Sequence, residues 1–142
     1  MENKPFIIPG VYVDWVEKIY GWGVFTKDKI EKHKIVEACP VVVYPEEILE
    51  IAAWNTQNDK HSYASLGISL YSLKWGEDHA AIPLGNGGIY NHSDNNNCMF
   101  MVNQEEGLLY IVALRDIEPG EQLLVTYGDT WFDGKPFPKV DL

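Results

Sequence analysis

The sequence predicts a mostly β fold in a single domain, with one or two short helices. β-branched and aromatic residues gather in short runs, and glycine and proline fall between these runs. The chain has 142 residues, close to the roughly 150 residues of one domain. A hydrophobic fraction of 46% is typical of a chain that buries a core, and a charged fraction of 23% excludes general disorder.

The first part of the chain is expected to form strands followed by a helix. The expected strands are Val11–Val13, Gly23–Phe25 and the longer Ile35–Val43, which are rich in residues that favour extended backbone. A proline and two acidic residues then suit a first helical turn, and apolar residues follow at helical spacing. This helical pattern consists of Pro45, Glu46 and Glu47, then Ile48, Ile51 and Ala52, with Trp54 nearby.

The last part of the chain returns to a strand pattern. Strands are expected at Cys98–Val102, Leu108–Leu114 and Leu123–Val125, separated by glycine-containing turns. Before them, Ala81–Asn97 is rich in glycine and asparagine and has no regular periodicity. We therefore expect irregular backbone in that segment, and such a segment often binds a ligand or has another functional role.

Charge and cysteine content restrict the function classes. The net charge of −10 repels phosphate backbones and attracts basic partners, so we expect a basic peptide and no nucleic acid. Cys39 and Cys98 are too few for a four-cysteine zinc site, and the four histidines lack ligand spacing, so no metal is expected. The sequence has no leader or membrane-span pattern, so we expect a soluble intracellular protein without a membrane partner. The expected compartment is the cytoplasm, or a host nucleus if the source is a virus or a secreted effector.

Three segments carry residues suited to chemistry. The two glycines of Gly21–Phe25 allow a ligand to approach the main chain, although a plain turn between strands is the alternative. Asn91–Asn97 offers many hydrogen-bonding side chains and could equally be a surface turn. Gly120–Gly128 places Tyr127 at the end of a short apolar strand, where an aromatic residue alone would be ordinary. Neither a dinucleotide fingerprint nor a serine-hydrolase elbow is present.

Together and in this order, the three segments resemble the motifs of SET-domain protein methyltransferases, most closely the small single-domain viral and bacterial members. Gly21–Phe25 is similar to the family's Gly-x-Gly motif, Asn91–Asn97 to its Asn-His-Ser-Cys-x-Pro-Asn motif, and Gly120–Gly128 to its Gly-Glu-Glu-Leu-x-x-Asp-Tyr-Gly motif. The chain departs from the family pattern at Asp94, Asn96, Gln122 and Thr126, whereas Asn91, His92 and Tyr127 are retained.

The resemblance implies a fold and an activity. It implies one SET domain with a core at about residues 11–128, in which small curved antiparallel sheets end in a C-terminal pseudoknot between the Asn91 segment and Leu123–Tyr127. Residues 129–142 would form a lid over the cofactor, since no zinc segment follows Tyr127. The implied activity is methyl transfer from S-adenosylmethionine to a protein lysine that enters from the opposite face.

The resemblance also implies site residues. Tyr127 would be catalytic by orienting the amine or the sulfonium methyl group. The cofactor would bind to Gly21, Trp22, Gly23, Asn91 and His92, with Trp131 stacked on the adenine. Tyr71, Tyr90 and Phe100 are candidates for the walls of an aromatic substrate channel, and plain core packing is the alternative for each.

The substrate is expected to be a basic protein segment such as a histone tail, because the chain is acidic. The resemblance leaves open a homodimer that completes the substrate groove. The alternatives are a catalytically silent SET-like module that binds a basic peptide, and a small β-rich interaction protein without cofactor affinity.

Overall fold

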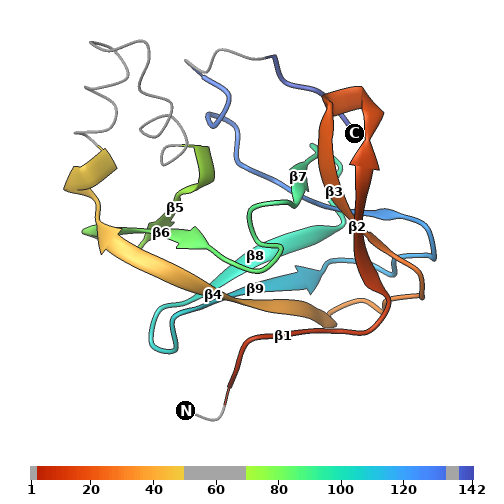
Figure 1. Cartoon of the computed structure of the whole chain (residues 1–142), viewed down its shortest axis with the longest axis horizontal. Helices are drawn as coiled ribbons and strands as arrows, with labels where there is room; N and C mark the ends of the chain where they lie inside the picture. The colour runs from red at the N-terminus through yellow and green to blue at the C-terminus, as the bar shows by residue number, and fades with distance from the viewer. Residues whose placement is uncertain (1–2, 50–69, 134–137) are drawn as a thin grey trace.

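The computed structural model describes residues 3–49, 70–133 and 138–142. Within these ranges the chain forms ten strands and one short 3₁₀ helix, and residues 47–49 and 70–71 are also helical, so the prediction of a mostly β fold is confirmed (Figure 1). In chain order the elements are β1 (Phe6–Ile7), β2 (Val11–Val16), η1 (Glu17–Ile19), β3 (Gly21–Thr26), β4 (Ile35–Pro45), β5 (Leu73–Trp75), β6 (His79–Pro83), β7 (Asn91–His92), β8 (Cys98–Asn103), β9 (Leu108–Ala113) and β10 (Gln122–Val125).

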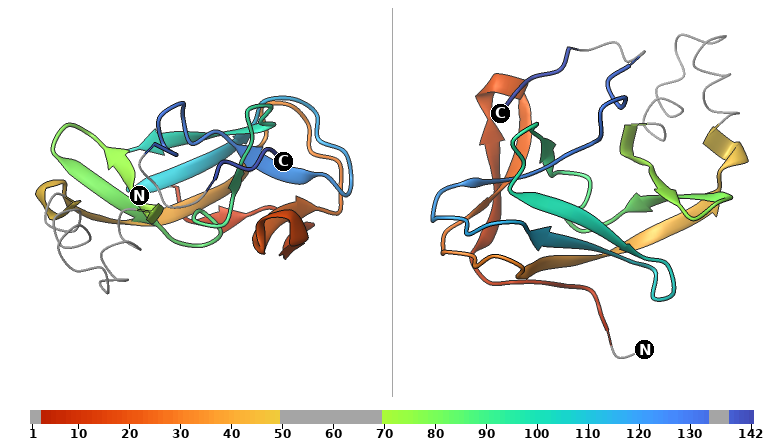
Figure 2. Two further views of the ribbon diagram at one scale, coloured as in Figure 1. Left: turned by 90° about the horizontal axis from the view of Figure 1, so that it is seen from above. Right: turned by 180° about the vertical axis from the view of Figure 1, so that it is seen from behind.

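The strands form two sheets. The larger sheet has the order β5-β6-β4-β9-β8, with β1 also paired to β4, and the smaller sheet has the order β2-β3-β10-β7. Every pair of these strands is antiparallel except β7 and β10, which run parallel. Figures 1 and 2 show the β2–β3 hairpin at one end of the molecule and β5–β6 at the other.

The core forms where β4, β9 and β10 present apolar side chains to one another. Val36, Ile111 and Leu123 are fully buried there, one from each of these strands. β4 is long enough to pair with β9 in its first half and with β6 in its second half. Strand β4 therefore connects the core to the β5–β6 end of the larger sheet.

The six predicted strands are confirmed as β2, β3, β4, β8, β9 and β10. The expectation of irregular backbone throughout Ala81–Asn97 is wrong, because Ala81–Pro83 belongs to β6 and Asn91–His92 forms β7. Alanine does not favour strands, and a two-residue strand has no periodicity to recognise. Both strands exist because they pair with β4 and β10, which lie far away in the sequence.

The predicted helix is described only at its start. Residues 47–49 are helical, and Pro45 is the last residue of β4 instead of part of a first helical turn. The expected apolar positions Ile51, Ala52 and Trp54 lie outside the described residues. Among the described residues, no helix is long and apolar enough to cross a membrane.

Candidate active site

The site is built where β7 lies beside β10. Asn91 pairs with Leu124 and His92 with Val125, and the N–H of Ser93 donates to the Val125 carbonyl at 2.9 Å. These two segments, distant in the sequence, lie side by side, as the resemblance implied. The other edge of β10 pairs with β3, so the short β10 strand brings all three sequence motifs together.

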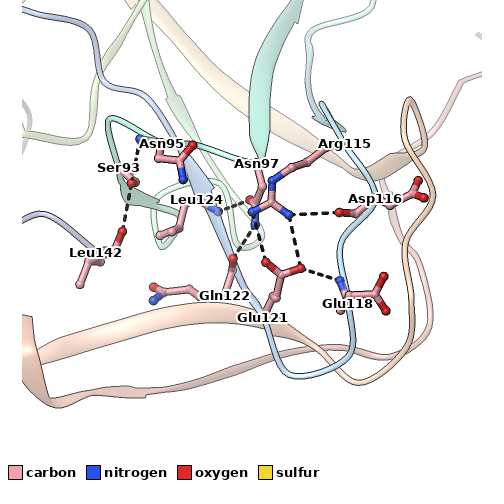
Figure 3. Close-up of polar contacts among 10 residues, drawn as sticks. All are labelled: Ser93, Asn95, Asn97, Arg115, Asp116, Glu118, Glu121, Gln122, Leu124 and Leu142. Carbon is pink, nitrogen blue, oxygen red and sulfur yellow. Dashed lines mark hydrogen bonds and ion pairs between the residues drawn. The ribbon is translucent and has the colours of Figure 1, made fainter.

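Asn97 fastens this junction. Its side-chain Nδ2 donates to the Gln122 carbonyl at 2.9 Å, and its Oδ1 accepts from the N–H of Leu124 at 2.8 Å. Figure 3 shows this amide reaching from the loop before β8 to β10. Asn97 is only 1% exposed, so these bonds form in a place that excludes water and hold the last residue of the second motif against the third.

Asn91 links the three motifs through its side-chain amide. Its Nδ2 lies 3.0 Å from the Trp22 carbonyl oxygen and 2.9 Å from Oε1 of Gln122. Among the described residues, none donates to its Oδ1. A Cβ atom on Gly23 would lie 3.1 Å from Nδ2 of Asn91 and 2.4 Å from Oε1 of Gln122. Glycine at position 23 is therefore what allows this arrangement.

His92 connects the junction to the C-terminal segment. Its side chain is buried, and its Nδ1 accepts from the Tyr127 N–H at 3.0 Å, which places the ring proton of the neutral form on Nε2. This Nε2 lies 3.1 Å from Oδ1 of Asp94, to which it donates. The same carboxylate pairs with Lys139 at 2.8 Å, and hydrogen bonds from Lys139 and then His92 hold the pKa of Asp94 below its usual value. Asp94, a departure from the family motif, thus joins His92 to the tail.

Tyr127 points its hydroxyl into the chain segment before Asn91. The phenol donates to the Tyr90 carbonyl at 2.5 Å. Its ring lies in an aromatic cluster, with centroids 4.7 Å from Trp131, 5.4 Å from His92 and 6.1 Å from Phe132. Burial, with a smaller contribution from Tyr71, raises the pKa of Tyr127 to about 12. The phenol therefore stays protonated at neutral pH.

A cavity of about 930 Å³ opens beside this junction. Such a volume is typical of ligand pockets, which span roughly 300–1,000 Å³. Most residues predicted for the site line this cavity, whereas Gly23 does not line it and instead leaves room for the Asn91 amide. The predicted site residues on the cavity wall are Gly21, Trp22, Tyr71, Tyr90, Asn91, His92, Phe100, Tyr127 and Trp131.

The three candidate channel residues differ in their surroundings. Tyr71 is 54% exposed, whereas Tyr90 is 1% exposed and turns its hydroxyl toward the Glu37 carboxylate at 2.7 Å. Phe100 is partly buried and packs against the main hydrophobic core. Of the three residues, only Tyr71 is therefore exposed, while Tyr90 and Phe100 combine contact with the cavity and packing in the core.

The C-terminal segment lies against the cavity. The Ser93 hydroxyl donates to the Leu142 carbonyl at 3.0 Å, as Figure 3 shows, and Lys18 donates to the Asp141 carbonyl. Val140 and Leu142 line the cavity together with Phe132. Sequence reasoning missed these tail contacts because no motif marks them.

Sequence reasoning also missed two polar residues that support the site. Gln122 departs from the family motif, and its side chain accepts from Asn91. Glu37 interrupts an apolar run, which was the available sign of a buried polar group. Among the described residues, no cluster of three or more potential metal ligands is present.

Comparison with known proteins agrees with this geometry. The SET domain family matches residues 21–128. A protein of Schizosaccharomyces pombe, named histone-lysine N-methyltransferase, H3 lysine-37 specific, is 26% identical over 114 residues, covering 80% of this chain and 71% of the relative. The crystal structure of a candidate histone methyltransferase of Plasmodium falciparum superposes with a TM-score of 0.65 at 26% identity, covering 89% of this chain and 100% of the other. With the matched region spanning all three motifs, the chain belongs to the SET-domain family.

Proposed function

We propose that this protein is an S-adenosylmethionine-dependent protein-lysine N-methyltransferase whose cavity receives both the cofactor and a lysine side chain. The observation that carries the proposal is the meeting of Asn91, His92 and Tyr127 on the wall of one aromatic-lined cavity. Membership of the SET-domain family and the similarity to a histone-lysine methyltransferase support lysine methyltransferase activity.

The residues of the cavity suit the cofactor. Oδ1 of Asn91 is available to accept a hydrogen bond from the ammonium group of a methionine moiety. Gly21 allows close approach to the main chain, and the rings of Trp131 and Phe132 offer apolar faces on which an adenine can stack. When bound, S-adenosylmethionine supplies an electrophilic methyl group on a positively charged sulfur.

The chain segment at residues 129–142 is proposed as the lid over this cofactor. Phe132, Val140 and Leu142 contribute apolar walls to the cavity. Their position is supported by the Ser93 hydrogen bond and by the ion pair between Lys139 and Asp94. Together with the core at about residues 11–128, this lid would complete a single SET domain.

The incoming lysine must lose its proton before its nitrogen can attack. With a reference pKa near 10.4, presenting the neutral amine at pH 7 costs about 4.6 kcal/mol in water. Burial among apolar side chains disfavours the ammonium form and reduces this cost. The rings of Tyr71 and Phe100, which line the cavity, would exclude water around the amine in this way and attract a cationic methylammonium product.

Tyr127 is proposed to orient the amine. Its hydroxyl proton is used in the bond to the Tyr90 carbonyl, which leaves the lone pairs of the phenol oxygen as acceptors. An amine N–H that donates to this oxygen has its own lone pair held in a fixed direction, as in-line displacement requires. Because its pKa is raised to about 12, the phenol acts as a positioning group and does not remove the lysine proton at neutral pH.

The proposed substrate is a lysine in a basic protein segment such as a histone tail. The net charge of −10 favours encounter with such segments through long-range attraction. The sequence chemistry gives no comparable support for nucleic acid as a direct partner.

The test is to incubate the protein with S-adenosylmethionine and core histones or a lysine-rich peptide, and to follow methyl addition to lysine by mass spectrometry. We expect methylated lysine only when the cofactor is present, and calorimetric titration should show cofactor binding. Cofactor binding without methyl transfer to any basic substrate would contradict the proposal and favour a silent peptide-binding module. The absence of any cofactor binding would contradict both.

A further inference from the structure

Glu37 is a carboxylate placed almost entirely inside the protein. It lies in β4 and is 4% exposed. The pairing of β4 with β9 is regular from Glu37 onward and shifts between Ile35 and Glu37. Such a bulge redirects the side chains beside it. Here the strand buries the consecutive residues from Val36 to Cys39, so the acidic side chain points inward together with apolar ones.

Both oxygens of this carboxylate have a hydrogen-bond donor. The Tyr90 hydroxyl donates to Oε1 at 2.7 Å, and the main-chain N–H of Asn86 donates to Oε2 at 2.9 Å. In the part of the chain that the structure describes, no lysine, arginine or histidine forms an ion pair with Glu37. Two neutral donors from the segment that precedes Asn91 therefore hold this acidic group, and the buried Cys39 thiol also lies beside it, since Glu37 contributes to the raised pKa of that thiol.

The segment is shaped to approach the carboxylate closely. Gly85 has a φ of +63°, and a Cβ atom there would lie 2.6 Å from Oε2 of Glu37. A side chain at position 85 would therefore force the carboxylate away from the Asn86 N–H. Glycine at this position allows the loop to wrap around the acidic group.

Burying an acidic group without a cationic partner carries a large desolvation penalty, which lowers the stability of the folded protein. An apolar side chain of similar size would often give a more stable fold. Burial and then the neighbouring Glu37 raise the pKa of the Tyr90 phenol, so Tyr90 remains a donor. The main chain of the same residue faces the site, because the Tyr90 carbonyl accepts the Tyr127 hydroxyl at 2.5 Å. Tyr90 thus links Glu37 to Tyr127, because its hydroxyl binds the Glu37 carboxylate and its carbonyl binds the Tyr127 phenol. This phenol is the group that we propose orients the substrate.

We propose that Glu37 is a positioning residue for methyl transfer, which anchors Asn86 and Tyr90 so that the Tyr90 carbonyl holds the Tyr127 hydroxyl in its productive direction. This inference rests on the proposed function. It assigns to Glu37 no contact with the cofactor or the lysine, and its effect is expected on turnover more than on cofactor affinity.

The test compares Glu37→Gln, Tyr90→Phe and the double variant. An amide offers one acceptor and one donor group, so it cannot accept from both Tyr90 and Asn86. We expect Glu37→Gln to lower kcat by about tenfold or more, since misplacement of order 1 Å can cost about 100-fold, with the Kd for S-adenosylmethionine nearly unchanged. Each single variant already disturbs the one hydrogen bond that joins Tyr90 to Glu37, so the loss in the double variant should be smaller than the product of the two single losses.

A second glutamate and tyrosine pair provides the matched control. The Tyr110 hydroxyl donates to Glu106 at 3.4 Å, and neither residue lines the cavity beside Tyr127. Glu106→Gln and Tyr110→Phe should leave kcat at the wild-type value. Folding of every variant is checked by thermal melting, and if Glu37→Gln does not fold, a loss of kcat in folded Tyr90→Phe supports the inference.

The possible results separate this inference from the proposed function. If the wild type transfers methyl groups and both single variants keep wild-type kcat, or if their losses simply multiply, the positioning role is wrong while the proposed function stands. If the wild type transfers no methyl group to any basic substrate, the proposed function is wrong and the positioning role falls with it.

Discussion

Replacing Tyr127 by phenylalanine removes one oxygen atom at the centre of the proposed site. The structure assigns that hydroxyl a 2.5 Å hydrogen bond to the Tyr90 carbonyl, while the ring contacts with Trp131 and His92 do not depend on it. The substitution therefore keeps the shape of the cavity and deletes a single donor and acceptor. It tests the orienting role of the phenol with little change in packing.

The loss of this hydroxyl should change both the free energy of unfolding and the rate of methyl transfer. Tyr90 is 1% exposed, so its carbonyl loses its phenol donor in a buried place, which should lower the free energy of unfolding by about 1–3 kcal/mol. An amine that is no longer oriented should react about 100-fold more slowly, which corresponds to about 2.7 kcal/mol of transition-state stabilisation. Single-turnover methylation measures the second quantity and denaturant unfolding the first.

The two measurements are read together with cofactor titration. We expect Tyr127→Phe to reduce turnover far more than affinity for S-adenosylmethionine. Tyr110→Phe is the control, because it also removes a phenol donor from a tyrosine, but at a place outside the cavity. Turnover of Tyr127→Phe equal to that of the wild type would refute the reasoning, whatever its stability.

Three further predictions follow from the same contacts. Asn91→Ala removes the amide that joins Trp22 to Gln122 and should abolish cofactor binding in calorimetry; unchanged binding would contradict the assignment. Gly23→Ala should weaken cofactor binding, because its Cβ would lie 2.4 Å from Oε1 of Gln122 and displace that amide; an unaltered Kd would count against this supporting role. Burial raises the pKa of the Cys98 thiol to about 12, and burial together with the neighbouring Glu37 raises the pKa of the Cys39 thiol as well, so the unfolded chain, with an ordinary value of 9.0, loses these protons first as pH rises. The free energy of unfolding should therefore fall from about pH 9, by about 1 kcal/mol per thiol at pH 10, and a urea midpoint that does not decrease between pH 8 and pH 10 would disprove it.

The long strands could be predicted from the residues themselves. β4 and β9 are runs of β-branched and aliphatic residues bounded by turns, and their local preference agrees with the burial they reach in the fold. β7 has two residues and exists only through its parallel pairing with β10. Its stability comes from a partner that is distant in the sequence, so no local pattern could reveal it.

The candidate site was accessible only through the resemblance of three motifs. Periodicity and composition do not indicate that Asn91 lies near Tyr127, since that contact depends on how β10 enters between β3 and β7. The resemblance implies that Gly23 contacts the cofactor, which stays a prediction; the structure adds that glycine at this position leaves room for the Asn91 amide. Glu37 was visible as a charge in an apolar run, but its donors could be identified only from coordinates.

The ion pair that holds the C-terminal segment could not be predicted from the sequence. Asp94 replaces the residue usual in the family motif, and its partner Lys139 lies outside every motif. An ion pair between two exposed residues carries no sequence pattern, and its effect on stability is expected to be small. The position of this ion pair is what matters for the site, because it joins the His92 segment to the proposed lid.

The position of the cofactor and of the lysine is best determined by a crystal structure with S-adenosylhomocysteine and a lysine peptide bound. We expect the cofactor sulfur in the cavity between Asn91 and Tyr127, with the lysine amine within hydrogen-bond distance of the phenol oxygen. Density for the cofactor at another surface, or a lysine side chain that never reaches Tyr127, would contradict it.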